Sequence, residues 1–141
     1  MYRKATLGDC KGIYDLICEL ESKKLPYDKF TEIFEKQTED QDYYCIVCLD
    51  DNENIVGALN LRFEEQLHHA GLIAEIMELV VAPECRKKGI GKQMLALACN
   101  IAKDQTCLQI EAASGERRVD AHRFYQREGL LNSHFKFTKI L

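Results

Sequence analysis

A short basic segment rich in glycine is the clearest candidate site for an anion. It places four cations and two glycines just before a predicted helix, and its members are Arg86, Lys87, Lys88, Gly89, Ile90, Gly91 and Lys92. Glycines let a backbone approach a ligand closely, and a helix N-terminus presents free N–H groups and the positive end of the helix dipole. The spacing is neither that of a Walker loop nor that of a dinucleotide-binding loop. The segment therefore predicts a cradle for a pyrophosphate, and the alternative is a solvated basic turn whose glycines serve packing.

Two carboxylates, Glu75 and Glu78, interrupt the otherwise apolar stretch 72–82 that precedes this loop. Charged residues are rare in a central strand, so they mark this strand as a candidate functional element. Regular strand alternation places them on opposite faces.

The cysteines and histidines favour no metal site. Seven cysteines, an odd number with scattered spacing, indicate reduced thiols and a cytosolic protein. Cys45 and Cys48 have the spacing of half a zinc site, but no second half follows, and they are interpreted as buried strand cysteines. His68 and His69 are adjacent, and on a strand they would point to opposite faces, which makes them a poor pair of ligands.

The elements that must position these residues follow from hydrophobic periodicity and turn signals. Apolar spacing predicts helices after the capping box at 6–9, around 28–36, after the loop at 83–91, and over 118–128 before Gly129. Strands are predicted at 2–5, 43–49, 55–63, 72–82, 106–112 and 135–141, with 43–49 and 55–63 as an antiparallel hairpin. The order predicts one α/β domain over residues 1–141 around a mixed sheet.

Composition narrows the function classes. The chain of 141 residues has a net charge of -4, and no apolar stretch reaches the roughly 20 residues that cross a bilayer. The charge is uneven, with 8 Lys and Arg against 17 Asp and Glu in residues 1–83, and 11 against 6 in residues 84–141. A mildly acidic whole argues against a nucleic-acid binder, while the basic C-terminal part leaves room for a polyanionic ligand.

Two motifs carry a resemblance to a known family. Val80-Val81-Ala82-Pro83 followed by Arg86-x-x-Gly89-x-Gly91 resembles the acetyl-CoA motif of the GNAT superfamily of N-acetyltransferases, and residues 121–129 resemble its second signature, Ala-x-x-x-Tyr-x-x-x-Gly. The resemblance covers essentially the whole chain. It is closest to the aminoalkylphosphonate N-acetyltransferase branch, through segments 16–20, 67–69, 78–81, 120–125 and 133–139.

The resemblance implies a fold and a cosubstrate. It implies an α+β domain with about four helices and a mixed, mostly antiparallel sheet of six to seven strands, splayed between the strands that contain Ala82 and Thr106. The pantetheine arm of acetyl-CoA would lie in the splay against backbone groups of Leu79, Val80 and Val81. The loop amides of 86–92 would hold the pyrophosphate.

The implied reaction is direct attack of a free amine on the thioester, which requires a base for the ammonium, an oxyanion partner and an acid for the thiolate. Glu75 matches the base position of one branch and is preferred, with Glu78 as the second candidate. The resemblance also implies a bulge in this strand, which would change the faces that regular alternation gives the two glutamates. An alternative for Glu78 is an ion pair with an arginine. Tyr125 matches the tyrosine that lies near the sulfur of CoA. Arg118 departs from the family, which often has Asn there.

The substrate is expected to be an aminoalkylphosphonate, whose anionic head needs cationic or histidine donors. Candidates are Arg62, His68, His69, His134 and Lys136; a divalent metal bridged by the histidines is the alternative and is not supported by ligand spacing. Another small amine or a protein amine is the second acceptor hypothesis, and a non-catalytic CoA-binding regulatory module is the third. The resemblance is also compatible with a homodimer.

Overall fold

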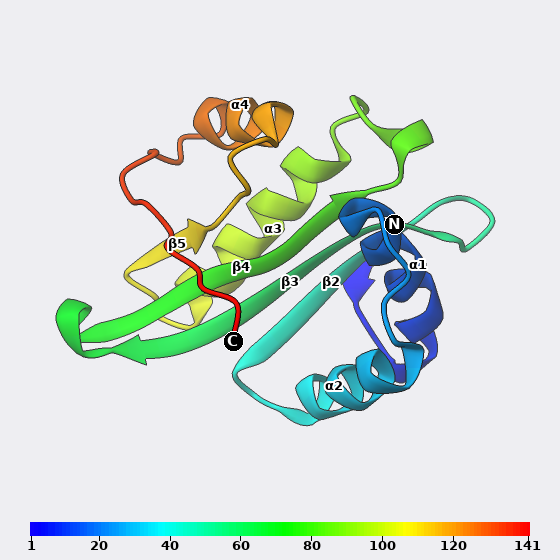
Figure 1. Cartoon of the computed structure of the whole chain (residues 1–141), viewed down its shortest axis with the longest axis horizontal. Helices are drawn as coiled ribbons and strands as arrows, with labels where there is room; N and C mark the ends of the chain where they lie inside the picture. Colours follow the sequence, from blue (N-terminus) through cyan, green and yellow to red (C-terminus); the bar gives the residue numbers. More distant parts are fainter.

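The computed structural model describes residues 1–141 and contains four helices and one five-stranded sheet (Figure 1). The strands are β1 (Tyr2–Lys4), β2 (Tyr43–Leu49), β3 (Ile55–Gln66), β4 (Gly71–Val81) and β5 (Gln109–Ala112). The helices are α1 (Cys10–Glu21), α2 (Tyr27–Glu39), α3 (Ile90–Asp104) and α4 (Val119–Arg127). No helix combines the length and the apolar character that a membrane crossing requires.

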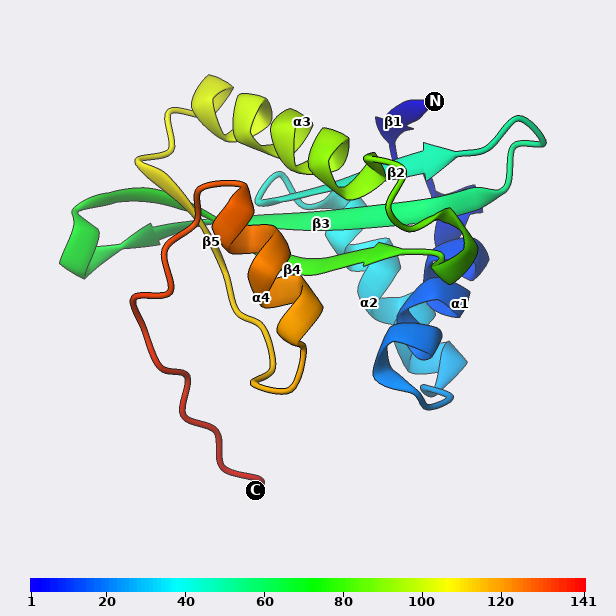
Figure 2. The ribbon, with the colours of Figure 1, turned by 90° about the horizontal axis from the view of Figure 1, so that it is seen from above.

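The sheet is mixed and mostly antiparallel, as expected. Its order is β1-β2-β3-β4-β5, and only the β4–β5 pair is parallel. Helices α1 and α2 cover one face and α3 the other (Figure 2). We call these the α2 face and the α3 face of the sheet.

Close packing of α3 on β3 depends on Gly57. A Cβ on this residue would lie 3.0 Å from Cε of Met94 and 3.2 Å from Cγ2 of Ile90, both in α3. Met94 is fully buried, as are Leu59 and Leu61, which lie on the same face of β3 as Gly57. The α3 face of β3 is therefore part of the core. The residues at the intervening positions of β3 point to the α2 face.

The N-terminus is tied to the first helix by an ion pair at the predicted capping segment. Arg3 Nη1 and Nη2 donate to the two carboxylate oxygens of Asp9 over 2.7 and 2.9 Å. The backbone N–H of Thr6 donates to the same carboxylate over 2.7 Å. Asp9 is buried, and the hydrogen bond from Arg3, ahead of the opposing effect of burial, lowers its pKa.

We expect Asp9→Ala to lower the free energy of unfolding by about 2 kcal/mol, because hydrogen bonds to a buried charge are lost. Since the pKa of Asp9 is lowered in the folded state, its contribution is present above the unfolded pKa and is lost as the pH falls through the lowered value. Urea denaturation of wild type and variant at neutral and acidic pH measures this. A difference between the two proteins that does not shrink at acidic pH would contradict it.

The expected six to seven strands are a wrong prediction, because the sheet has five. The predicted strand at 135–141 does not form, and residues 128–141 carry no regular structure. Phe135 and Phe137 are 90% and 92% exposed. The segment has a strand-like pattern, but a strand needs a hydrogen-bonding partner, and the tail extends away from the sheet (Figure 2).

Candidate active site

A β-bulge in β4 places both glutamates on the same face. Asn60 of β3 pairs with Glu78, whereas the next residue, Leu61, pairs with Ile76, so Met77 has no partner. Paired residues of an antiparallel ladder point to the same side, and Asn60 and Leu61 point to opposite sides. Glu78 therefore lies with Asn60 on the α2 face. Regular alternation from Ile76 puts Glu75 there too, which the sequence left open.

Glu78 is held by a hydrogen bond and is partly desolvated. Asn60 Nδ2 lies 3.4 Å from Oε1 of Glu78 and 3.0 Å from Oε1 of Gln37 in α2, and it donates to both. Burial raises the pKa of Glu78, the hydrogen bond from Asn60 opposes this, and the charge of Glu21 at the end of α1 adds to the rise. Glu78 thus combines a fixed orientation with a proton affinity above that of an ordinary carboxylate.

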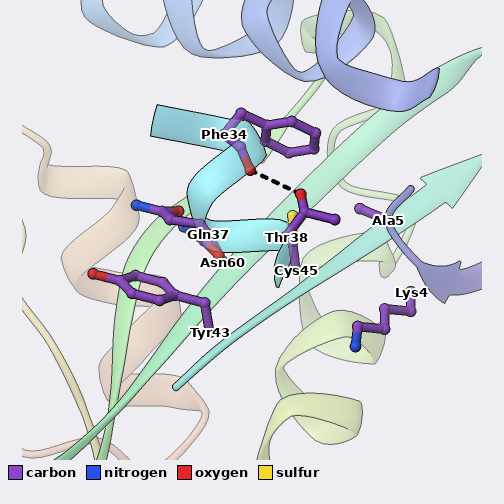
Figure 3. A pocket seen from close by; sticks show the side chains of 8 residues that line it. All are labelled: Lys4, Ala5, Phe34, Gln37, Thr38, Tyr43, Cys45 and Asn60. Atoms are coloured by element: carbon purple, nitrogen blue, oxygen red, sulfur yellow. Dashed lines mark hydrogen bonds between the residues drawn. The ribbon is translucent and has the colours of Figure 1, made fainter. Parts of the chain in front are cut away.

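Beside this pair, a small cavity lies between α2 and the strands (Figure 3). It measures about 20 Å³, room for about one water molecule, and its lining residues are Lys4, Ala5, Phe34, Gln37, Thr38, Tyr43, Cys45 and Asn60. In Figure 3 the amide of Gln37 lies next to Asn60. The cavity is too small for an organic substrate.

The cysteines behave as strand residues, as interpreted. Burial, followed by the charges of Glu78 and Asp9, raises the pKa of Cys45 to about 12, so its thiol stays protonated. Cys45 pairs with Asn60 on the α2 face, whereas Cys48 pairs with Gly57 on the α3 face. The two thiols cannot share a metal, and no group of three or more potential metal ligands occurs in the structure.

Glu75 lies in a row of charged residues on the α2 face. Its neighbours in register are Arg62 on β3 and Glu111 on β5. Arg62 Nη2 donates to Oε1 of Glu64 over 2.9 Å. Arg62 is therefore close to the glutamates, as a substrate residue must be, but its charge is already paired.

The pairing between β4 and β5 ends partway along β4. Their pairing covers only Ile73–Ile76 against Gln109–Ala112, and the remainder of β4 has no neighbour on that side. Ala82 N–H donates to Val56 O over 2.8 Å, so by antiparallel alternation the peptide groups of Leu79 and Val81 point away from β3, into the opening. The carbonyl of Val81 accepts from Nε of Arg86 over 3.1 Å.

The basic loop leads into the N-terminus of α3. Gly89 has φ +82° and no atom within 4 Å of the position of a Cβ, so it faces open space. A Cβ on Gly91 would lie 3.5 Å from the ring of Phe124 in α4. The side chains of Arg86, Lys87, Lys88 and Lys92 are exposed. Backbone donors and cations thus surround an open space, which fits a pyrophosphate.

Tyr125 is brought near this loop by α4. It follows Phe124, whose ring packs on Gly91, and the two rings make an edge contact with centroids 5.4 Å apart. Burial raises the pKa of Tyr125, and Arg118 opposes this. Arg118 itself donates to Oε1 of Glu21 over 3.2 Å and so joins the start of α4 to the end of α1.

The structure does not bring the three candidate histidines to Glu78. His68 and His69 lie in the turn between β3 and β4, with ring centroids 4.3 Å apart, and Nδ1 of His69 lies 2.7 Å from Oε1 of Gln66. Glu78 is seven positions along β4 from Gly71, roughly 23 Å. His134 lies on the exposed tail.

Sequence reasoning missed the groups that surround Glu78, namely Asn60, Gln37 and Glu21. The sequence pattern could have indicated Asn60, because it is a polar residue at an alternate position of an apolar strand. No sequence pattern could have indicated Gln37 or Glu21, because each lies on a helix surface among other polar residues.

The structure is an α+β domain in which part of β4 is unpaired beside a glycine-rich loop. These are the features that the resemblance to the N-acetyltransferases implies. The acetyltransferase (GNAT) family matches residues 11–130, and the chain belongs to this family. It is an acetyl-CoA-dependent N-acetyltransferase.

Among its relatives, the aminoalkylphosphonate N-acetyltransferase of Salmonella typhimurium is 42% identical over 139 residues, which are 99% of this chain and 90% of that protein. A solved transcriptional regulator from Bacillus halodurans C-125 is 26% identical, with a TM-score of 0.91 over 100% of this chain and 99% of the other. Glucosamine-6-phosphate N-acetyltransferase from Arabidopsis thaliana shares the fold, with 20% identity and a TM-score of 0.83 over 99% and 97%.

Proposed function

We propose that this enzyme transfers the acetyl group of acetyl-CoA to the primary amine of an aminoalkylphosphonate. The observation that carries the proposal is the 42% identity to the Salmonella enzyme over 99% of the chain. We also infer a cytoplasmic location, since all seven cysteines are unpaired.

In this proposal acetyl-CoA lies in the opening between β4 and β5. The peptide groups of Leu79 and Val81, which point into the opening, bind the pantetheine arm and orient the thioester, with Val80 between them. The loop 86–92 and the N-terminus of α3 hold the pyrophosphate. The empty space beside Gly89 supports this arrangement, because the backbone there is accessible to a bulky anion.

We assign the role of base to Glu78. An alkylamine is almost entirely protonated at neutral pH, so a carboxylate has to take its proton, directly or through water. Glu78 is held by Asn60, and burial raises its pKa, so it binds a proton more readily than an ordinary carboxylate does. These observations favour Glu78 over Glu75, the candidate preferred from sequence. Glu75, on the same face, is then left to attract the ammonium group.

Tyr125 is proposed as the acid. Burial raises its pKa, so the phenol remains protonated at neutral pH and can donate to the departing thiolate of CoA. Its position on α4, next to the Phe124 that packs on Gly91, supports a place beside the cofactor loop.

Replacing Gly89 tests the anion cradle. Gly89→Ala puts a Cβ into the open space and strains a positive φ, and we expect the KM for acetyl-CoA to rise about tenfold through loss of part of the anion-binding site. Steady-state kinetics at varied acetyl-CoA measure it. Gly129→Ala is a matched control, because Gly129 also has a positive φ, +94°, with no atom within 4 Å. Both variants should lose about 1–2 kcal/mol of stability, and equal KM changes in both would contradict the cradle.

The acceptor is tested by release of CoA thiol with a panel of amines. The panel contains 1- and 2-aminoalkylphosphonates, the matching aminoalkyl carboxylates, a polyamine and a peptide amine. The highest kcat/KM is expected with an aminoalkylphosphonate. A higher value with another amine would reassign the substrate, and no thiol release with any amine would favour a CoA-binding regulatory module.

A further inference from the structure

We propose that Arg118 selects the anionic head of the acceptor, by exchanging its carboxylate partner, Glu21, for the phosphonate of the substrate. This role rests on the proposed function, because it belongs to the same acceptor site. It makes Arg118 the residue that distinguishes an aminoalkylphosphonate from an amine without an anion.

Arg118 and Glu21 form an ion pair between two helices on either side of β4. Nη2 of Arg118 donates to Oε1 of Glu21 over 3.2 Å, although the two residues are 97 positions apart in the chain. Figure 1 shows β4 running between α4 and α1, and α1 packs on β4. The ion pair therefore joins the helix that carries Tyr125 to a helix that packs on the strand of Glu78.

Each partner of the ion pair lies close to one of the two proposed reacting groups. Burial raises the pKa of Glu78, and the charge of Glu21 is near enough to add to the rise. Burial raises the pKa of Tyr125, and the charge of Arg118 is near enough to oppose it. Arg118 and Tyr125 are about two helical turns apart, so they lie on the same side of α4. A cation thus lies between the proposed base and the proposed acid, where the acceptor has to bind.

The ion pair is weakly held. It consists of one hydrogen bond, and the side chains of Arg118 and Glu21 are 39% and 43% exposed. Exposed ion pairs of this kind contribute little to stability. A guanidinium has several N–H donors and binds a phosphonate through two parallel hydrogen bonds, which is stronger than a single bond to a carboxylate. The phosphonate of a bound substrate therefore displaces Glu21 from Arg118.

Arg62, the arginine expected from the sequence, is less suited to this role. It donates to Oε1 of Glu64 over 2.9 Å, and it is in register with Glu75 on β4. A phosphonate at Arg62 would meet two carboxylates, whose charges repel it. Arg118 has a single carboxylate within ion-pair distance.

Steady-state kinetics with two acceptors test the exchange. 2-Aminoethylphosphonate carries the anion, and propylamine does not. Arg118→Gln should raise the KM for 2-aminoethylphosphonate by about 10- to 100-fold, the effect of losing hydrogen bonds to a charged group. It should leave kcat/KM for propylamine and the KM for acetyl-CoA unchanged. Arg118→Lys keeps the charge without the planar fork and should give an intermediate KM.

The matched control is Arg123→Gln. Arg123 lies on the same helix, is exposed, and pairs only with Asp120, over 3.6 Å. This variant should keep the wild-type KM for both acceptors. Thermal unfolding of all the variants should stay close to that of the wild type, because the ion pairs that they lose are exposed.

Glu21→Gln should have the opposite effect. It removes the carboxylate that competes for Arg118, so it should lower the KM for 2-aminoethylphosphonate, whereas an ion pair that only fastens α4 to α1 would make both variants worse. Binding is also measured without turnover, by calorimetric titration of 2-aminoethylphosphonate into enzyme saturated with CoA. Affinity should fall in Arg118→Gln and rise in Glu21→Gln.

The role of Arg118 is overturned if Arg118→Gln weakens both acceptors equally, raises the KM for acetyl-CoA, or leaves 2-aminoethylphosphonate unaffected. Affinity that does not rise in Glu21→Gln overturns the exchange as well. A wild type without preference for 2-aminoethylphosphonate over propylamine overturns the proposed function, and this role with it. A preference that persists in Arg118→Gln overturns only the role of Arg118.

Discussion

Glu78→Gln is expected to lower kcat/KM by about 10²- to 10⁴-fold, the range typical of a lost general base. The amide keeps the size of the side chain and the hydrogen bond with Asn60, but it cannot take a proton from the ammonium group. The KM for acetyl-CoA should change little, because in the proposed arrangement the cofactor is held by the β4 backbone and the loop 86–92, not by Glu78. Steady-state kinetics with both substrates varied measure the effect.

The pH dependence separates this role from a structural one. Burial raises the pKa of Glu78 above its usual value, so the wild-type kcat/KM should fall on the acidic side at a pH above the ordinary carboxyl range. Glu78→Gln should lack that acidic limb. Glu75→Gln is the matched control on the same face, and it should keep the limb. If Glu75→Gln loses the limb instead, the base is Glu75.

Stability gives a second readout for Glu78. Because the folded protein raises the pKa of this carboxyl, its contribution to stability is greatest below the ordinary value and is lost as the pH rises through the raised one. At pH 7 the buried charge is therefore a cost. Glu78→Gln should be at least as stable as wild type in urea denaturation. A marked loss of stability would mean that lower activity reflects a damaged fold.

Tyr125→Phe is expected to lower kcat about 100-fold with acetyl-CoA affinity nearly intact, because only the phenol proton is removed. The ring stays, so its edge contact with Phe124 is preserved. Calorimetric titration with CoA and turnover with the best amine measure the two quantities separately.

The control for this variant is Tyr44→Phe. Tyr44 pairs with Leu61 and so lies on the α3 face, away from the glutamates. It should keep wild-type turnover. Wild-type turnover in Tyr125→Phe would remove the tyrosine from the chemistry, and weakened CoA binding would make it a binding residue instead.

Local sequence patterns predicted much of the fold. The hairpin 43–49 and 55–63 and all four helices form where periodicity and turn residues predicted them, with ends shifted by a few residues. The glycine loop opens α3, and Gly89 has the positive φ that makes glycine necessary there. These features depend on neighbours in sequence, which is why the sequence alone predicts them.

The amino-acid sequence by itself therefore determined the family motifs, the helices, the hairpin and the anion loop. The tertiary structure alone decided which face Glu78 occupies, because the bulge at Met77 arises from the register of β4 against β3. It also decided that Asn60 holds Glu78, and that residues 135–141 form no strand. Strand pairing and burial are set by residues far apart in the chain, so no local pattern encodes them.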